Sequence, residues 1–230
     1  MIPIQALHMK LQRRFRPSFL EPVAAAIRAD LELNDSIPIK VAVSLAARAD
    51  DMQSHLRSGH LCTDVMHSAW SARNLLEIQV WSLFVSQSIA NALRFQRDSL
   101  LDTISVAKAG KALAESAISP GLSDSEKETV QRMYAQLLED THASDDDEKA
   151  RFLDVGKTAD LVGLGAQFRF LNKFASKFVH ATAYSVMCPP RAPFDRQLCD
   201  VLFLNGGNAA VQALDTISRN LTILRVPVAL

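Results

Sequence analysis

The chain has 230 residues, with 25 basic and 25 acidic side chains, 48% hydrophobic and 7% aromatic residues. This composition excludes a disordered chain, a collagen-like fibre and a small disulfide-stapled scaffold, because it supplies ample apolar residues for a core. The formal net charge of zero gives no global field that would attract nucleic acid or an acidic membrane. Alanine and leucine are the most frequent residues and glycine occurs only 8 times, which favours helices over turn-rich sheets.

Cysteine usage and hydropathy indicate a cytoplasmic protein without a membrane partner. Cys62, Cys188 and Cys199 are odd in number and lack the C-x-x-C spacing of a zinc or redox site, so we interpret them as reduced thiols. The most apolar stretch, residues 75–93, carries several polar side chains and is interpreted as a buried helix. Residues 1–17 are basic and are expected to form an arm or a first helix, with an organelle presequence as the alternative.

Nearly every segment between breaks has helical periodicity, so the predicted elements in chain order are helices. The first clearly bounded helix is predicted to begin near Ser36 and to end at a turn over residues 58–63. Thr63 or Asp64 is predicted to cap a second, long helix that reaches about Arg97. The pattern beyond it either continues that helix or follows a kink.

The second half of the chain has equally clear helix signals. Ser123 followed by Glu126 forms the clearest capping box and predicts a helix start. A further helical stretch, residues 154–183, is predicted to be interrupted at Gly163 or Gly165. The residues expected to face inward from the helix that the capping box opens are Val130, Met133, Leu137 and Leu138.

The last predicted elements are a proline-rich loop over residues 187–194 and a helix over residues 196–224, loosened at Gly206 and Gly207. No internal repeat and no convincing linker divides the chain. We therefore predict one all-α domain over residues 1–230, an antiparallel bundle of about six to eight helices.

One face of the long central helix combines charged and aromatic residues. Arg73 and Glu77 are four residues apart and can pair. An exposed pair would not normally be flanked by two tryptophans on its own face, and an unpaired buried charge costs several kcal/mol. The pair is therefore expected to find partners on another helix. The residues that share this face are Met66, Trp70, Arg73, Glu77, Trp81 and Phe84.

A second helix supplies those partners. Its polar face is predicted to hold Arg169, Lys173, Ser176 and His180, at steps of four, three and four residues. The imidazole of His180 is the natural acid–base candidate, because its unperturbed pKa lies near about 6.5. The alternative is a hydrogen-bonded structural histidine at the edge of the core.

These two helices carry a resemblance to a bacterial family of uncharacterised helical proteins. Its members share an Arg-x-x-x-Glu helix and a later Ser-x-x-x-His helix that aromatic residues precede. Phe168 and Phe170 stand where that family tends to have tyrosine. The resemblance implies a shared polar site. The residues that match the two motifs are Arg73, Glu77, Ser176 and His180.

The chain is more loosely similar to the HEPN superfamily of helical bundles. Some of its members cleave RNA at a dimer interface with an arginine and a histidine four to six residues apart. Here the arginine that most closely precedes His180 is Arg169, which does not fit that spacing. Arg73 could supply the arginine from another helix.

A cluster of histidine, cysteine and aspartate residues lies around the predicted turn. It is dense enough to suggest a metal ion, but the turn scatters its members and no standard ligand spacing occurs. We therefore expect no metal site and no cofactor, and interpret the cluster as surface or turn residues. Its members are His55, His60, Cys62, Asp64 and His67.

Two functions follow from the sequence. The first is a binding or regulatory module, with Asn74, Arg169 and Lys173 as further binding residues beside the four matched residues. The alternative is a metal-independent hydrolase or ribonuclease, in which His180 is the acid or base and Arg73 stabilises phosphoryl charge. Glu77 would orient the arginine. The partners considered are a second copy of the chain, RNA and a small ligand, none of which a motif supports.

Overall fold

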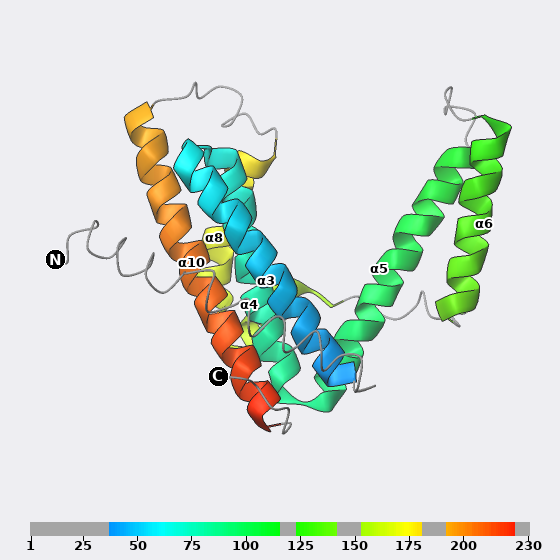
Figure 1. Ribbon diagram of the computed structural model, residues 1–230, viewed down its shortest axis with the longest axis horizontal. Coiled ribbons are helices and arrows are strands. Elements are labelled where there is room, and N and C mark those ends of the chain that lie inside the picture. Colours follow the sequence, from blue (N-terminus) through cyan, green and yellow to red (C-terminus); the bar gives the residue numbers. More distant parts are fainter. Residues whose placement is uncertain (1–36, 116–122, 142–152, 181–191, 224–230) are drawn as a thin grey trace. The chain divides into compact units, whose positions relative to one another are not determined.

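The computed structural model describes residues 37–115, 123–141, 153–180 and 192–223. Within these ranges the backbone forms seven α-helices and no strand, which confirms the predicted all-α bundle (Figure 1). The chain divides into two compact units, Met1–Ala92 with Asp154–Leu230, and Leu93–Leu153. The single domain predicted for residues 1–230 therefore stays a prediction.

Helix α3 (Ile37–Cys62) begins where the sequence predicts, one residue after Ser36. Its end differs from the prediction, because the helix continues through Gly59 instead of turning there. A Cβ atom on Gly59 would lie 2.8 Å from the Ser68 hydroxyl of the next helix. This glycine thus permits a close helix approach, which explains why a residue typical of turns occurs inside a helix.

The turn after α3 is short and sharply defined. Thr63 has a φ angle of 56°, in the left-handed region, and the carboxylate of Asp64 accepts a hydrogen bond from the backbone N–H of His67. Asp64 is therefore the N-cap of α4 (Val65–Gln87), as one of the two predicted alternatives states. The tight turn places α3 and α4 side by side in opposite directions (Figure 1).

Helix α4 occupies the centre of the first unit and ends earlier than predicted. It ends at Gln87 instead of near Arg97, because Ser88 has extended backbone angles and its hydroxyl accepts from the backbone N–H of Asn91. Ser88 thereby caps the start of α5 (Ile89–Glu115). The polar residues of this stretch thus serve to end one helix and begin the next.

Helix α10 (Ala192–Ile223) packs along α4 in the same direction, so the bundle is not antiparallel throughout. The direction follows from contacts that advance together along both helices, from Ser68 with Cys199 to Gln79 with Gln212. The start of α10 also corrects the predicted loop over residues 187–194, because Pro193 and Phe194 lie in the first turn of the helix. Proline is tolerated there, since the first helical N–H groups have no partner within the helix.

The predicted loosening of α10 at Gly206 and Gly207 is wrong, because the helix is continuous through both residues. A Cβ atom on Gly206 would lie 2.9 Å from the Cα atom of Ala72 and 2.8 Å from Leu56. The missing side chain lets three helices meet closely. Small buried residues further along α10, including Ala209 and Ala213 with no exposed area, extend this close contact.

Two shorter helices complete the first unit, α7 (Val155–Leu161) and α8 (Gly165–Val179). They confirm the predicted interruption, which falls at Gly163, where φ is 80°. Glycine adopts this left-handed conformation without strain. A hydrophobic cluster fixes α8 against α4 and α7. Its buried members are Leu76, Val80, Ala159, Phe168 and Leu171.

The second unit contains most of α5 and all of α6 (Asp124–Thr141). The capping box at the start of α6 is confirmed, since the Glu126 carboxylate accepts from the backbone N–H and the hydroxyl of Ser123, both at 2.7 Å. These hydrogen bonds lower the pKa of Glu126. Met133, predicted to face inward, is instead 67% exposed, while the side chains of Val130, Leu137 and Leu138 lie outside the described part of the structure.

No helix in the described ranges is long and apolar enough to cross a membrane. Two predicted elements lie outside those ranges: the basic arm or helix over residues 1–17 and the part of the proline-rich loop that precedes residue 192.

Candidate functional site

Helices α4 and α8 bring together three of the four residues that the sequence singled out. The Arg73 guanidinium donates from Nε to Glu77 Oε1 at 3.2 Å, one turn further along α4. Its Nη1 atom lies 3.5 Å from Nε2 of His180, at the C-terminal end of α8. We call Arg73, Glu77 and His180 the interhelical cluster. It joins the two helices by polar contacts beside the hydrophobic cluster that packs them.

The interhelical cluster remains open to solvent. The side chains of Arg73 and Glu77 are 29% and 28% exposed, and His180 is exposed. A guanidinium group has five N–H donors, and the two contacts with Glu77 and His180 use two of them. The remaining donors are available to water or to a ligand with an acceptor group.

The fourth matched residue, Ser176, is turned away from the arginine by a local hydrogen bond. Its hydroxyl donates to the backbone oxygen of Asn172 at 2.6 Å, four residues earlier on the same helix. A serine hydroxyl within a helix commonly donates to the backbone oxygen four residues earlier. Ser176 contributes to the site through its backbone instead, because its carbonyl oxygen accepts from the N–H of His180 at 3.4 Å.

The three further binding residues are not brought to one point. The Asn74 amide donates to the backbone oxygen of Trp70, within α4. Arg169 pairs with Asp160 at 2.6 Å and thereby ties α8 to α7. Lys173 is exposed on α8, between the other two cations of that helix, Arg169 and Lys177. The site predicted from the sequence is thus reduced to the interhelical cluster and the basic surface of α8.

The charge around the interhelical cluster is positive on balance. Helix α8 carries three cations and no acid, but Asp160 of α7 neutralises Arg169, and Arg73 and Glu77 cancel each other. Lys173 and Lys177 remain as the source of the positive charge. The C-terminal end of a helix has partial negative charge, which Lys177 in its last turn and Arg73 beside it offset. A ligand approaching this surface therefore meets cations and hydrogen-bond donors.

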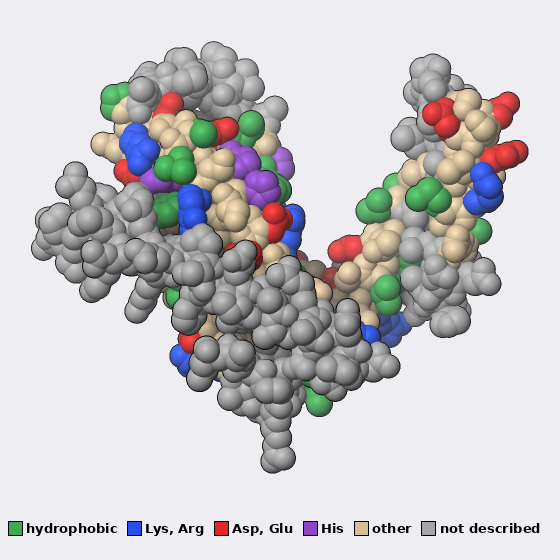
Figure 2. Space-filling model, in the orientation of Figure 1, with side chains coloured by type: hydrophobic (Ala, Val, Ile, Leu, Met, Phe, Trp, Pro, Cys, Tyr) green, Lys and Arg blue, Asp and Glu red, His purple; other side chains and the backbone are tan. Residues whose placement is uncertain are grey.

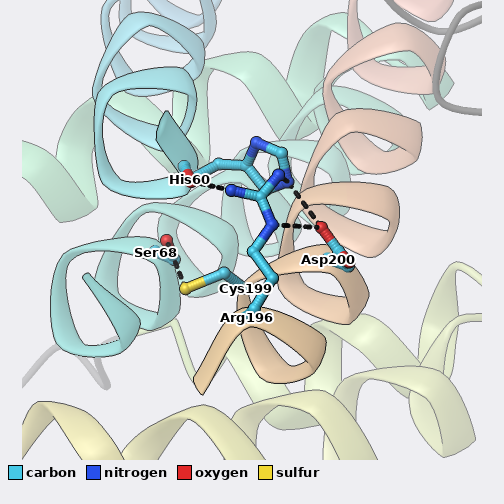
Figure 3. Close-up of polar contacts among 5 residues, drawn as sticks. All are labelled: His60, Ser68, Arg196, Cys199 and Asp200. Carbon is cyan, nitrogen blue, oxygen red and sulfur yellow. Dashed lines mark hydrogen bonds and ion pairs between the residues drawn. The ribbon is translucent and has the colours of Figure 1, made fainter. Parts of the chain in front are cut away.

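A second polar group, absent from the predicted site, lies between the end of α3 and the start of α10 (Figure 3). His60 Nε2 is 2.7 Å from Asp200 Oδ1, and the His60 side chain is only 3% exposed. Arg196 pairs with Asp200 at 3.3 Å and donates to the backbone oxygen of His60 at 3.2 Å. We call His60, Arg196 and Asp200 the buried network.

The buried network is satisfied internally and packed against an aromatic ring. The short contact with a carboxylate oxygen requires that Nε2 of His60 carries a hydrogen. The imidazole also lies against Phe203, with ring centroids 4.4 Å apart. Because partners and packing surround it, His60 fixes the position of α3 relative to α10.

A thiol next to the buried network has no character of a nucleophile. Cys199 has no exposed area, and its Sγ atom accepts a weak hydrogen bond from Ser68 at 3.7 Å (Figure 3). Burial raises the pKa of the Cys199 thiol, although the Ser68 hydrogen bond and the charge of Arg196 partly oppose this. A thiol is a poor nucleophile when protonated, so the residue is structural.

The sequence contained one weak signal for the buried network. Arg196 and Asp200 are four residues apart near a helix start, which is the spacing of a pair, while the apolar neighbours of Asp200 indicate burial. The sequence singles out His60 only as a member of the histidine-rich cluster at the predicted turn, which comprises His55, His60, Cys62, Asp64 and His67. Nothing in the local sequence indicates that residues 60 and 200 meet, because that contact depends on the packing of α3 and α10.

The histidine-rich cluster itself divides into separate contacts. Histidine side chains gather over the ends of α3 and α4 that meet at the turn (Figure 2). His55 and His67 have ring centroids 5.3 Å apart, and both rings also contact Trp70. Among the described residues, no three histidine, cysteine or acidic side chains are arranged to hold a metal ion.

In comparisons with known proteins, no family model, no curated protein and no solved structure matches the chain. The resemblances to a bacterial helical family and to HEPN bundles therefore stay predictions.

Proposed function

We propose that this chain is a cytosolic binding module whose interhelical cluster binds an acidic group of a ligand or partner. The observation that carries the proposal is the position of Arg73, which is held by Glu77 and meets His180 of another helix at a solvent-facing edge. A positioned guanidinium loses little freedom when it binds a carboxylate or phosphate, and its planar donors match both groups. The free thiols of Cys62 and Cys199 support a reducing compartment.

The contrast with an ordinary surface pair supports a binding role. Arg219 and Asp215 are also four residues apart, with Nη2 and Oδ2 at 2.6 Å, but this pair lies on α10 alone and is 76% and 56% exposed. An exposed pair of this kind contributes about 0–1 kcal/mol to stability. Arg73 differs because it also contacts His180 of a second helix, so residues of two helices define the geometry of the interhelical cluster.

Calorimetric titration with inorganic phosphate tests this proposal. We expect wild type to bind phosphate, and Arg73→Ala and His180→Ala to weaken the affinity by about tenfold, because one charge-assisted hydrogen bond contributes about 1.5 kcal/mol or more. Arg219→Ala is the matched control and should bind as wild type does. Equal binding by all four proteins would refute the proposal, as would equal weakening by Arg219→Ala.

The structure also favours a second candidate function, a metal-independent ribonuclease. The Arg73–His180 contact of 3.5 Å brings together, from two helices, an arginine and a histidine like those that the HEPN-type motif holds four to six residues apart. His180 would act as the acid or base, Arg73 would stabilise the developing phosphoryl charge, and Glu77 would orient the arginine. A homodimer, named above as a partner of the binding module, would also suit this candidate, since HEPN cleavage takes place at a dimer interface.

Cleavage of a fluorogenic RNA in the presence of a chelator tests the second candidate. Wild-type protein should cleave it, whereas His180→Ala should lose the activity without losing its fold, and sedimentation should show a dimer. If phosphate binds but RNA stays intact, the binding module stands and the nuclease is excluded.

A further inference from the structure

A row of phenylalanine rings runs along the outer side of α8. Phe170 is 67% exposed although it is a large apolar residue. Its ring is parallel to that of Phe174, with an interplanar angle of 6° and centroids 6.1 Å apart. Phe174 in turn meets Phe178 edge-on at 5.3 Å. Three rings at four-residue spacing therefore form one continuous aromatic row.

Phe170 lies away from the apolar face that holds α8 in the bundle, while Phe174 and Phe178 are half-buried. Phe168, Leu171 and Ala175 are 3%, 6% and 1% exposed and face α4 and α7. At about 100° per residue, Phe170 lies roughly 160° around the helix from Phe168. The core of the unit therefore does not require Phe170, and its exposure needs another explanation.

Cations lie between the aromatic row and the interhelical cluster. On the same helical projection, Lys173 and Lys177 fall between the side that carries Phe170 and the side that carries His180. Both lysines are exposed, and α8 has no acidic residue. The outer surface of α8 thus presents aromatic rings, then ammonium groups, then the Arg73–His180 contact.

We propose that this surface binds single-stranded nucleic acid, with a base stacked on Phe170 and the backbone phosphates on Lys173 and the interhelical cluster. The inference rests on the proposed binding module and names its ligand class. Exposed aromatic rings next to cations are the combination that binds single strands, because every base has a face to stack and every nucleotide has a phosphate. The positive charge of this surface thus favours nucleic acid, whose phosphate backbone is negatively charged.

The same surface is less suited to a lipid membrane. A helix that lies in a membrane interface inserts a wide apolar face, whereas the wide apolar face of α8 is already buried against α4. Of the aromatic row only Phe170 is largely exposed, beside the half-buried Phe174 and Phe178. A membrane therefore serves as an alternative outcome of the test.

Fluorescence anisotropy with a labelled single-stranded oligouridine tests the proposal. Phe170→Ala should weaken oligouridine affinity by about tenfold, the loss expected for one stacked base, while binding of inorganic polyphosphate stays as in wild type. Phe170→Trp should restore oligouridine binding. Lys173→Ala should weaken both ligands and reduce the dependence of log affinity on log salt by about 0.7.

Matched controls separate this effect from a general loss of structure. Phe194→Ala removes a ring of 47% exposure from α10, and Lys127→Ala removes a lysine from α6; neither should alter oligouridine binding. Circular dichroism and the urea midpoint should be unchanged in Phe170→Ala. Equal loss of oligouridine and polyphosphate binding in this variant would contradict base stacking.

The two proposals can fail separately. If Phe170→Ala leaves oligouridine binding intact, or if anionic phosphatidylserine vesicles bind more tightly than oligouridine, the nucleic-acid inference is overturned while phosphate binding at Arg73 stands. If Arg73→Ala leaves phosphate binding intact but Phe170→Ala weakens oligouridine binding, the aromatic surface stands and the role of the interhelical cluster is overturned.

Discussion

The interhelical cluster and the buried network contain the same kinds of residue, an arginine, a histidine and an acid, in two different surroundings. In the buried network the histidine side chain is 3% exposed, while Arg196 and Asp200 are 44% and 25% exposed. In the interhelical cluster the arginine is 29% exposed and keeps donors facing solvent. The two groups differ at the histidine, which is buried in the first and exposed in the second. The first group therefore has a structural role, whereas the second can bind a ligand.

The largest expected effect is the loss of stability on His60→Ala. The substitution removes a packed imidazole and leaves Asp200 and Arg196 without their buried partner, so we expect a loss of about 2–4 kcal/mol. Urea unfolding followed by circular dichroism measures it. The control is His55→Ala, at a side chain that is 43% exposed, where a change within about 0.5 kcal/mol is expected. Equal losses of stability at the two positions would contradict the structural role of His60.

The next largest effect is expected at Gly206, which lets α10 approach α3 and α4 closely. Gly206→Val places methyl groups where Ala72 and Leu56 already lie, so the free energy of unfolding should fall by about 1–3 kcal/mol. Gly110→Ala is the control, because nothing lies within 4 Å of that position, and it should stabilise α5 by about 0.5–1 kcal/mol. A tolerated valine would show that the helices are not in close contact.

A smaller change in stability is expected for Arg73→Ala. The Arg73–Glu77 pair is partly exposed and solvent weakens its attraction, so the free energy of unfolding should fall by less than about 1 kcal/mol. Urea unfolding beside Arg219→Ala provides the comparison. A loss of stability as large as that caused by His60→Ala would show that the interhelical cluster has a structural role.

The smallest effect at neutral pH concerns Cys199. Because burial raises the pKa of this thiol above its ordinary value of 9.0, its ionisation costs the folded state more than the unfolded state. The stability contribution is fully present below pH 9.0 and falls as the pH rises through the raised pKa. Urea midpoints of wild type and Cys199→Ala measured across that range check the sign. Iodoacetamide at pH 8 should modify the exposed Cys62 well before Cys199.

Local signals predicted most of the fold. The capping residues Asp64 and Ser123 and the interruption at Gly163 were readable because each acts on its immediate neighbours. The sequence predicts a turn at Gly59 and a loosened helix at Gly206, and both predictions are wrong. The role of these glycines depends on a neighbouring helix, and a glycine that permits close packing has the same sequence appearance as one that permits a bend.

The site was predictable only in part, for the same reason. Helical spacing placed Arg73 with Glu77 on one face of α4 and singled out His180, which directly follows the last turn of α8 as its C-cap. Spacing could not show that the Ser176 hydroxyl would bond to its own helix, nor that His60 would meet Asp200 at a separation of 140 residues. Both outcomes are decided by side-chain rotamers and helix packing.

The most direct test of a ligand-binding interhelical cluster is urea unfolding of wild type, Arg73→Ala and Arg219→Ala with and without inorganic phosphate. At a phosphate concentration about ten times the dissociation constant, a ligand that binds only the folded state should stabilise it by about 1.4 kcal/mol. We expect this gain in wild type and Arg219→Ala and a gain of only about 0.4 kcal/mol in Arg73→Ala, whose affinity for phosphate should be about tenfold lower. Without phosphate, the free energy of unfolding of Arg73→Ala should change by less than about 1 kcal/mol. A large loss of stability in Arg73→Ala, with an undiminished gain from phosphate, would contradict the account and make the cluster a second structural network.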